Sequence, residues 1–249
     1  MIKILALGNS LSQDATRYLH DIAHAAGDDI KVVNLYIGGC TLARHYRNML
    51  SGAKEYEYEF NGAYVGLKVS LDEALYSDYW DYMTVQQASY QSFSYESCRP
   101  YIDRIKEHMT LACPKARILI HQIWGYQNGS RRLETAGFSD FKEMLAASRA
   151  VTHRLAGELG FDGIVPCGDA MALAFDGGIE KLHRDDIHVS YGLGRYLTGL
   201  VWYRTFTGKN IAGNTFSDLD EPASERDIAI AKRAAEQAVE SCRDINKLS

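Results

Sequence analysis

The chain has 249 residues, which suits one α/β domain, and its 46% hydrophobic and 24% charged residues are an ordinary globular composition. A net charge of −5 without any basic run argues against a nucleic-acid-binding surface. No apolar run reaches the length of a membrane span, and five scattered cysteines without a Cys-x-x-Cys are typical of reduced thiols. We therefore expect a single cytoplasmic domain, residues 1–249, without nucleic-acid or membrane partners; its oligomeric state is left open.

The first forty residues predict the start of a doubly wound sheet. Residues 2–7 form an apolar run ended by Gly8, as in a buried parallel strand. Apolar residues recur at helical spacing over residues 11–26, and a second apolar run, residues 30–37, ends at Gly38 and Gly39. This β-α-β order indicates an α/β fold with a parallel sheet.

Residues 54–69 break that rhythm. Tyrosine and phenylalanine alternate with glutamate up to Asn61 and Gly62, and a second aromatic and aliphatic run follows. Alternation around Asn-Gly predicts a β-hairpin, which we interpret as an insertion flanking the core sheet.

The rest of the chain returns to alternating strands and helices. Strands are expected at residues 81–87, 117–123 and 161–165, and helices at residues 71–77, 100–113, 138–159, 169–174, 191–206 and 223–242. Residues 88–97 and 124–137 are expected to be loops rich in aromatic side chains. No repeat or linker divides the chain.

Two short motifs near the ends of the chain carry the chemistry. Gly8-Asn9-Ser10 closes the first strand, and Asp185-Asp186-Ile187-His188 precedes the helix expected at residues 191–206. A serine at a strand-to-helix turn and a late Asp-x-x-His supply a nucleophile, a base and a carboxylate that orients the base. Only folding could bring them together.

These motifs resemble the SGNH (GDSL-type) hydrolase superfamily, and most closely a bacterial branch of unassigned function. The resemblance runs from Ile2 to about Phe206 and includes GNSLSQDATRYL, residues 8–19. It implies a three-layer α/β/α fold with a flavodoxin-like parallel sheet.

The resemblance also implies roles for particular residues. Ser10 matches the nucleophile, and His188 and Asp185 match the base and its partner, with Asp186 as the competitor by position. The backbone N–H groups of Ser10 and Gly39 match two donors of the oxyanion hole.

One block departs from the family pattern. The family places Gly-x-Asn-Asp after the third strand, with the asparagine as the third oxyanion donor, whereas this chain has Gln86 and Gln87 there. Because a glutamine amide offers the same N–H₂ donor on a longer arm, Gln87 is the first choice for this role and Gln86 the second.

Aromatic side chains in the two expected loops suit the faces of sugar rings, and ordinary packing is the alternative. The substrate-binding candidates are Tyr90, Tyr95, Trp124 and Tyr126, with Phe93 beside them. His20 and His24 lie four residues apart without a third ligand, so we expect no metal, and no nucleotide-binding motif points to a cofactor.

The sequence therefore predicts a serine esterase that removes small O-acyl groups, often acetyl in this superfamily, from a small-molecule or carbohydrate ester. Two alternatives stay open. One is a non-catalytic flavodoxin-like module that holds an anion at the Gly8-Asn9-Ser10 turn. The other is an SGNH scaffold that has lost catalysis and binds a glycan.

Overall fold

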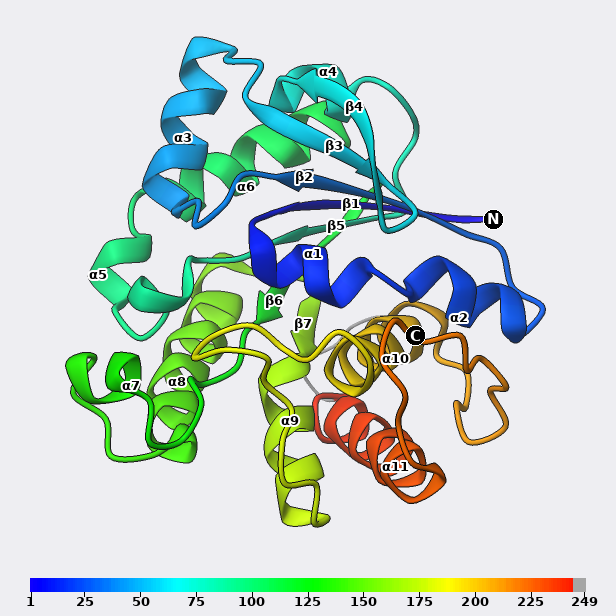
Figure 1. Cartoon of the computed structure of the whole chain (residues 1–249). Coiled ribbons are helices and arrows are strands. Elements are labelled where there is room, and N and C mark those ends of the chain that lie inside the picture. The colour runs from blue at the N-terminus through cyan, green and yellow to red at the C-terminus, as the bar shows by residue number, and fades with distance from the viewer. Residues whose placement is uncertain (244–249) are drawn as a thin grey trace.

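In the computed structural model, which describes residues 1–243, seven strands form one sheet in the order β4-β3-β2-β1-β5-β6-β7 (Figure 1). The strands are β1 (Ile2–Gly8), β2 (Ile30–Tyr36), β3 (Tyr56–Phe60), β4 (Ala63–Val69), β5 (Tyr82–Val85), β6 (Arg117–Gln122) and β7 (Gly163–Pro166). The five strands β2, β1, β5, β6 and β7 run parallel. The predicted parallel sheet is confirmed; residues 244–249 of the predicted domain lie outside the described residues.

The predicted hairpin is formed by β3 and β4. Asn61 and Gly62 both have positive φ, 49° and 80°, as a tight two-residue hairpin turn requires. β3 pairs antiparallel with β2, so the insertion extends the parallel sheet by two strands.

Helices cover both faces of the sheet (Figure 1). They are α1 (Ser10–Thr16), α2 (Leu19–Ala25), α3 (Leu42–Ser51), α4 (Leu71–Leu75), α5 (Tyr95–Cys98), α6 (Tyr101–Ala112), α7 (Arg131–Thr135), α8 (Phe141–Leu159), α9 (Cys167–Asp176), α10 (Leu193–Thr207) and α11 (Glu225–Ser241), with a 3₁₀ turn η1 (Ser89–Gln91).

Three differences from the predicted helices stand out. The helix expected over residues 11–26 is two helices, because the chain turns at Tyr18, whose φ and ψ are −110° and 2°. α3 was not predicted, although Leu42, Tyr46 and Met49 recur at helical spacing and pack against a core of the protein. α5 and α7 are short helices inside segments expected to be loops.

The strands alternate their side chains between two apolar cores. Ile4 and Ala6 of β1 face the core made with α1, α2, α9, α10 and α11. Leu5 and Leu7 face the core made with α3, α4 and α6. This alternation is the period-two pattern of a strand buried on both faces.

The strand order determines where the end of β1, and the turn that carries Ser10, lie in the sheet. Leaving out the hairpin, the parallel order is that of a doubly wound sheet whose crevice opens where connections depart in opposite directions. β1 lies at that switch and leads directly into α1, so the first predicted motif sits at the carboxyl edge of the sheet. Within residues 1–243, no helix combines the length and the apolar composition needed to cross a bilayer.

Candidate active site

Ser10, His188 and Asp185 form a continuous hydrogen-bonded chain. The Ser10 Oγ lies 2.8 Å from Nε2 of His188, and Nδ1 of the same ring lies 2.9 Å from Oδ2 of Asp185. Because a carboxylate can only accept, Nδ1 carries the proton and Nε2 is free to accept from the serine. The structure thus brings together residues that are 178 positions apart in the sequence.

The Asp-x-x-His segment is a closed turn. The Arg184 N–H donates to the His188 carbonyl at 2.9 Å. The other carboxylate oxygen of Asp185 accepts from the backbone N–H groups of Ile187 and His188, each at 2.7 Å. One side chain therefore shapes the turn and orients the imidazole.

These contacts also set the charge of Asp185. Partial burial alone would raise the pKa of its carboxyl group, but the backbone N–H donors and the His188 ring outweigh burial and lower the pKa to about 2. The group is therefore an anion at neutral pH. Asp186, the competitor, offers its carbonyl oxygen to the Gln127 N–H at 2.9 Å.

Asn9 shapes the turn that presents Ser10. It caps α1, because its Oδ1 accepts from the Leu11 N–H at 3.0 Å, and Ser12 Oγ accepts from the Asn9 N–H at 3.1 Å. Asn9 is the N-cap residue, and Ser12 completes the capping box. A Cβ on Gly8 would lie 2.1 Å from Ser12 Oγ, so this close approach requires glycine. The Ser10 hydroxyl is left free to meet His188.

The turn that carries Gly39 is tied to the same asparagine. Asn9 Nδ2 donates to the Cys40 carbonyl at 3.1 Å, which holds the turn beside the start of α1. Gly39 has φ of 60°, and a Cβ there would meet no atom within 4 Å, so the backbone conformation explains the glycine. Cys40 is fully buried, and burial raises the pKa of its thiol to about 12, which makes it a poor nucleophile.

Both candidate glutamines have other partners. Gln86 donates to Asn9 Oδ1 at 2.8 Å and accepts from His121 Nδ1 at 2.5 Å, so it braces the nucleophile turn. Gln87 donates from Nε2 to the carbonyl and hydroxyl of Ser97, and its Oε1 accepts from the N–H groups of Leu42 and Ala88. The oxyanion role predicted for Gln87 would compete with its bonds to Ser97, whereas Gln86 uses one of its two N–H groups on Asn9.

A buried ion cluster, which the sequence analysis missed, links α1 to the turn at residues 185–188. Asp14, one turn beyond Ser10, is fully buried and accepts from Arg184 at 2.9 Å and from Arg195 at 2.8 Å. Both guanidinium groups lie over the ring of Tyr191, at 4.4 and 4.6 Å. We call Asp14, Arg184 and Arg195 the Asp14 clamp. It joins the helix that carries Ser10 to the residue that precedes Asp185.

The predicted aromatic residues divide into two groups. Tyr90 and Tyr126 line a hollow beside the catalytic turn. Trp124 is buried and donates from Nε1 to the Ile187 carbonyl at 2.7 Å, so it supports the turn from beneath. Tyr95 is packed under Arg154, 3.7 Å from its ring centre, and hydrogen-bonds Glu158 on α8.

This hollow, which we call the loop hollow, has a volume of about 640 Å³. It is lined by Tyr90, Phe93, Tyr126, Arg131, Arg132, Thr135, Ala136 and Asp186.

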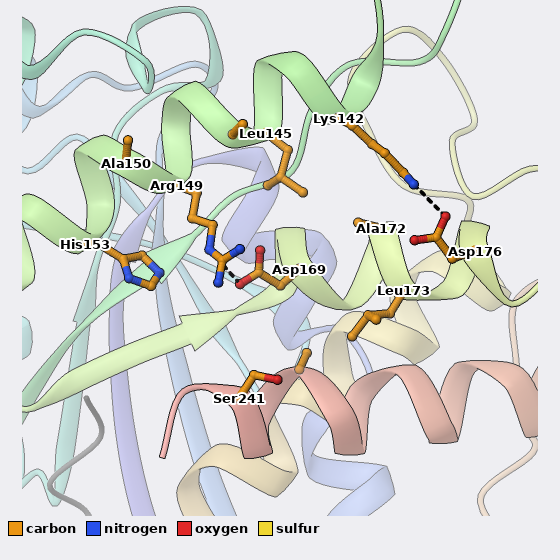
Figure 2. Close-up of a pocket in the computed structure, with 12 residues that line it drawn as sticks. Lys142, Leu145, Arg149, Ala150, His153, Asp169, Ala172, Leu173, Asp176 and Ser241 are labelled. Atoms are coloured by element: carbon orange, nitrogen blue, oxygen red, sulfur yellow. Dashed lines mark hydrogen bonds and ion pairs between the residues drawn. The ribbon is translucent and has the colours of Figure 1, made fainter. Parts of the chain in front are cut away.

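A second hollow lies between α8, α9 and α11 (Figure 2). His153, Asp169 and Cys242 bring ligand-type atoms within 4.8 Å of one another there. However, Nε of Arg149 lies 3.5 Å from Asp169, so this carboxylate already faces a cation. None of the triad residues lines this hollow, and our expectation of no metal stays a prediction.

Comparison with known proteins gives the family of this fold. The model of DUF4886, described as a domain of unknown function, matches residues 3–238. A crystal structure of a DUF4886 family protein from Bacteroides uniformis is 29% identical, with a TM-score of 0.88 over 96% of this chain and 95% of that chain. A comparison with curated proteins gave no match.

More distant structures share the fold. A Slackia heliotrinireducens protein provisionally classed as an SGNH hydrolase is 21% identical, with a TM-score of 0.59 over 82% of this chain and 97% of that chain. A member of the lipolytic G-D-S-L family from Veillonella parvula is 14% identical, with a TM-score of 0.52 over 83% of this chain and 99% of that chain. These likenesses confirm the predicted resemblance in fold.

Proposed function

The chain belongs to the DUF4886 family, which has the SGNH-type fold, and from the site on that fold we propose that it is a serine esterase. The observation that carries the proposal is the chain of contacts from Ser10 Oγ through His188 to Asp185, at 2.8 and 2.9 Å. A nucleophile, a base and an orienting carboxylate in this order are what acyl transfer to a serine requires.

The proposed reaction follows from this geometry. His188 Nε2 takes the proton as Ser10 Oγ attacks the ester carbonyl, and the Asp185 carboxylate stabilises the imidazolium that forms. The Ser10 N–H, one of the amides at the start of α1 without an acceptor inside the helix, and the Gly39 N–H donate to the oxyanion. His188 then protonates the leaving alcohol, and water attacks the acyl-enzyme to regenerate the serine.

The proposed substrate is a small O-acyl ester, with acetyl as the acyl group and a carbohydrate as the alcohol. The support for the carbohydrate is the loop hollow, where Tyr90, with 54% of its surface exposed, can offer a ring face to a sugar.

A second candidate is a catalytically inactive SGNH scaffold that binds a glycan or an anion. Its specific support is that the amide of Gln87 is bonded to Ser97 and that of Gln86 to Asn9, so neither side chain is reserved for the oxyanion. The two candidates differ in whether Ser10 reacts.

Labelling with a fluorophosphonate tests this difference, because the probe reacts covalently with an activated serine. We expect intact-mass analysis to show one adduct on the native chain and on Ser139→Ala, which alters an exposed serine, and none on Ser10→Ala. Hydrolysis of 4-nitrophenyl acetate should disappear in parallel. An unlabelled native protein with no turnover would reject the esterase and favour the binding scaffold.

A further inference from the structure

The loop hollow shares a wall with the catalytic turn. Asp186, which lines it, directly follows Asp185. Tyr126, which also lines it, belongs to a small apolar cluster with Leu133 and Met144, and Ile187 of the turn at residues 185–188 packs against the same cluster. A group bound in this hollow would therefore be held next to the residues that act on the ester.

Two aromatic side chains that line the loop hollow, Tyr126 and Phe93, are held in place by contacts with their neighbours. Tyr126 is buried, and its hydroxyl donates to Ser89 Oγ at 3.0 Å. Phe93 packs edge-on against Phe138 with ring centres 5.0 Å apart. Contacts within the loop after β5, with η1 and with the segment before α8 therefore hold Tyr126 and Phe93 in place. The ring of Tyr90, by contrast, is exposed.

The loop hollow carries two positive charges that no side chain in the described part of the chain neutralises. Arg131 and Arg132 are exposed, and neither guanidinium has an ion pair or a hydrogen bond to any residue in the range 1–243. By contrast, Arg154 and Arg184 are held by carboxylates. The single acidic side chain that lines the hollow is Asp186, so two positive groups face one negative group.

We propose that the loop hollow selects substrates whose alcohol half is an acidic sugar, with the carboxylate on Arg131 and Arg132 and the sugar ring on Tyr90. This inference rests on the proposed function and names its substrate class. Arginine suits the task because its planar guanidinium donates two parallel hydrogen bonds to a carboxylate. A volume of about 640 Å³ lies within the range of small-molecule sites and leaves room for one or two sugar rings.

Binding can be measured without turnover, on the Ser10→Ala variant. We expect calorimetry to give at least about tenfold tighter binding of a galacturonate oligosaccharide than of a neutral xylose oligosaccharide, since one charge-assisted hydrogen bond contributes roughly that factor. The preference should shrink as salt is raised. Equal affinity for the two sugars would overturn the proposal, and so would a preference for a sulfated neutral oligosaccharide over the galacturonate.

Substitution assigns the preference to the two arginines. On the Ser10→Ala background, Arg131→Gln and Arg132→Gln should each weaken galacturonate binding about tenfold, whereas Arg233→Gln, which removes an equal charge from an exposed site on α11, should not. In the active chain, the same two substitutions should lower the ratio of kcat/KM for acetylated polygalacturonate to that for acetylated xylan by about the same factor. A ratio that stays constant would reject the role of the arginines.

The two proposals fail in different ways. A chain that binds the acidic oligosaccharide through the arginines but never releases acetate would reject the esterase and keep the site. A chain that hydrolyses both polymers equally well would reject the site and keep the esterase.

Discussion

The side chain of Asp185 makes two kinds of hydrogen bond, and its neighbour Asp186 makes different contacts. Its Oδ1 accepts two backbone N–H groups and its Oδ2 accepts from the imidazole, whereas Asp186 contributes a carbonyl to the turn and a side chain to the loop hollow. Two adjacent aspartates therefore have different surroundings, although the sequence alone cannot say which of them faces the ring.

Asp185→Asn should lower kcat for 4-nitrophenyl acetate by roughly 100- to 10,000-fold, because an amide cannot fix the tautomer and stabilise the imidazolium as a carboxylate does. The matched variant Asp186→Asn should lose less than about tenfold. Steady-state kinetics on both variants gives the comparison. If Asp186→Asn were the more damaged of the two, the orienting carboxylate would be misassigned.

The variant Gln87→Ala tests whether the side-chain amide of Gln87 donates to the oxyanion or only stabilises the fold. Its amide joins Ser97 to the N–H groups of Leu42 and Ala88, so we expect the truncation to lower Tm by several degrees and to slow turnover less than about tenfold. Kinetics and thermal unfolding on the same preparation separate the two effects. If turnover instead slowed by roughly two or three orders of magnitude while Tm stayed unchanged, the oxyanion role predicted from the sequence would be restored.

The pairing of Ser10 with His188 was predictable from sequence, and the side chains that support it were not. Ser10 and His188 occupy short motifs whose spacing reflects a local backbone turn, and the structure places them within hydrogen-bond distance. Gln87 and Trp124 also come directly after strands. Their hydrogen-bond partners, Ser97 and Ile187, lie on separate loops, and the packing of those loops determines the pairing. No local pattern encodes that choice.

At the scale of elements, α1 carries both Ser10, the proposed nucleophile, and Asp14, which anchors the turn at residues 185–188. Ser10 begins the helix and Asp14 lies one turn later, so the helix fixes the distance between them. Because Asp14 is fully buried between two guanidinium groups, any shift of the turn would leave charges unpaired in the protein interior. The clamp thus limits how far His188 can move from Ser10.

Asp14→Asn should destabilise the fold by about 3–5 kcal/mol, the cost of breaking a buried ion pair. Below the Tm of the variant, kcat should fall about 10- to 100-fold while KM changes little, because the misplaced base affects the chemical step. Asp220→Asn is the control: it removes the exposed outer partner of Arg195 and should cost less than about 1 kcal/mol. A folded Asp14→Asn variant with native kcat would reduce the clamp to a purely structural role.

The buried strands were predictable from their apolar runs, whereas the helices α3 and α7 were missed. The runs that became β1 and β2 are almost continuously apolar, so their type was evident. α3 begins where Thr41 Oγ1 accepts from the Arg44 N–H, and α7 begins where Ser130 Oγ accepts from the Leu133 N–H. Such polar starts look like loops in a sequence until the apolar face has a partner.

At the scale of the whole molecule, the sheet supplies the site and its polar interior restricts the useful pH range. The order of the strands brings the turn after β1 to the crevice at the carboxyl edge, where Asn9 and Gln86 connect neighbouring strands. The same interior encloses histidines that burial keeps neutral in mild acid. His45 and His121 have pKa values lowered to about 3 by burial, and burial lowers that of His183 to about 4.

These buried histidines predict that the protein loses stability in mild acid. Consider a histidine whose pKa in the folded protein lies below its unfolded value of about 6.5. Above a pH of about 6.5 it does not change the free energy of unfolding. As pH falls from there towards the folded pKa, it lowers the free energy of unfolding by up to about 1.4 kcal/mol per pH unit. His45 shows the cause, because its Nε2 is buried without a partner within residues 1–243.

Urea unfolding at several pH values between about 6.5 and 5 measures this slope. His45→Asn should reduce the slope by up to about 1.4 kcal/mol per pH unit, because one protonation of the unfolded chain is removed. His24→Asn, which alters a solvent-exposed histidine on α2, serves as the matched control and should leave the slope close to that of the native chain. If both variants retained the native slope, protonation of His45 in the unfolded chain would not be what weakens the fold in acid, and another buried group would have to account for it.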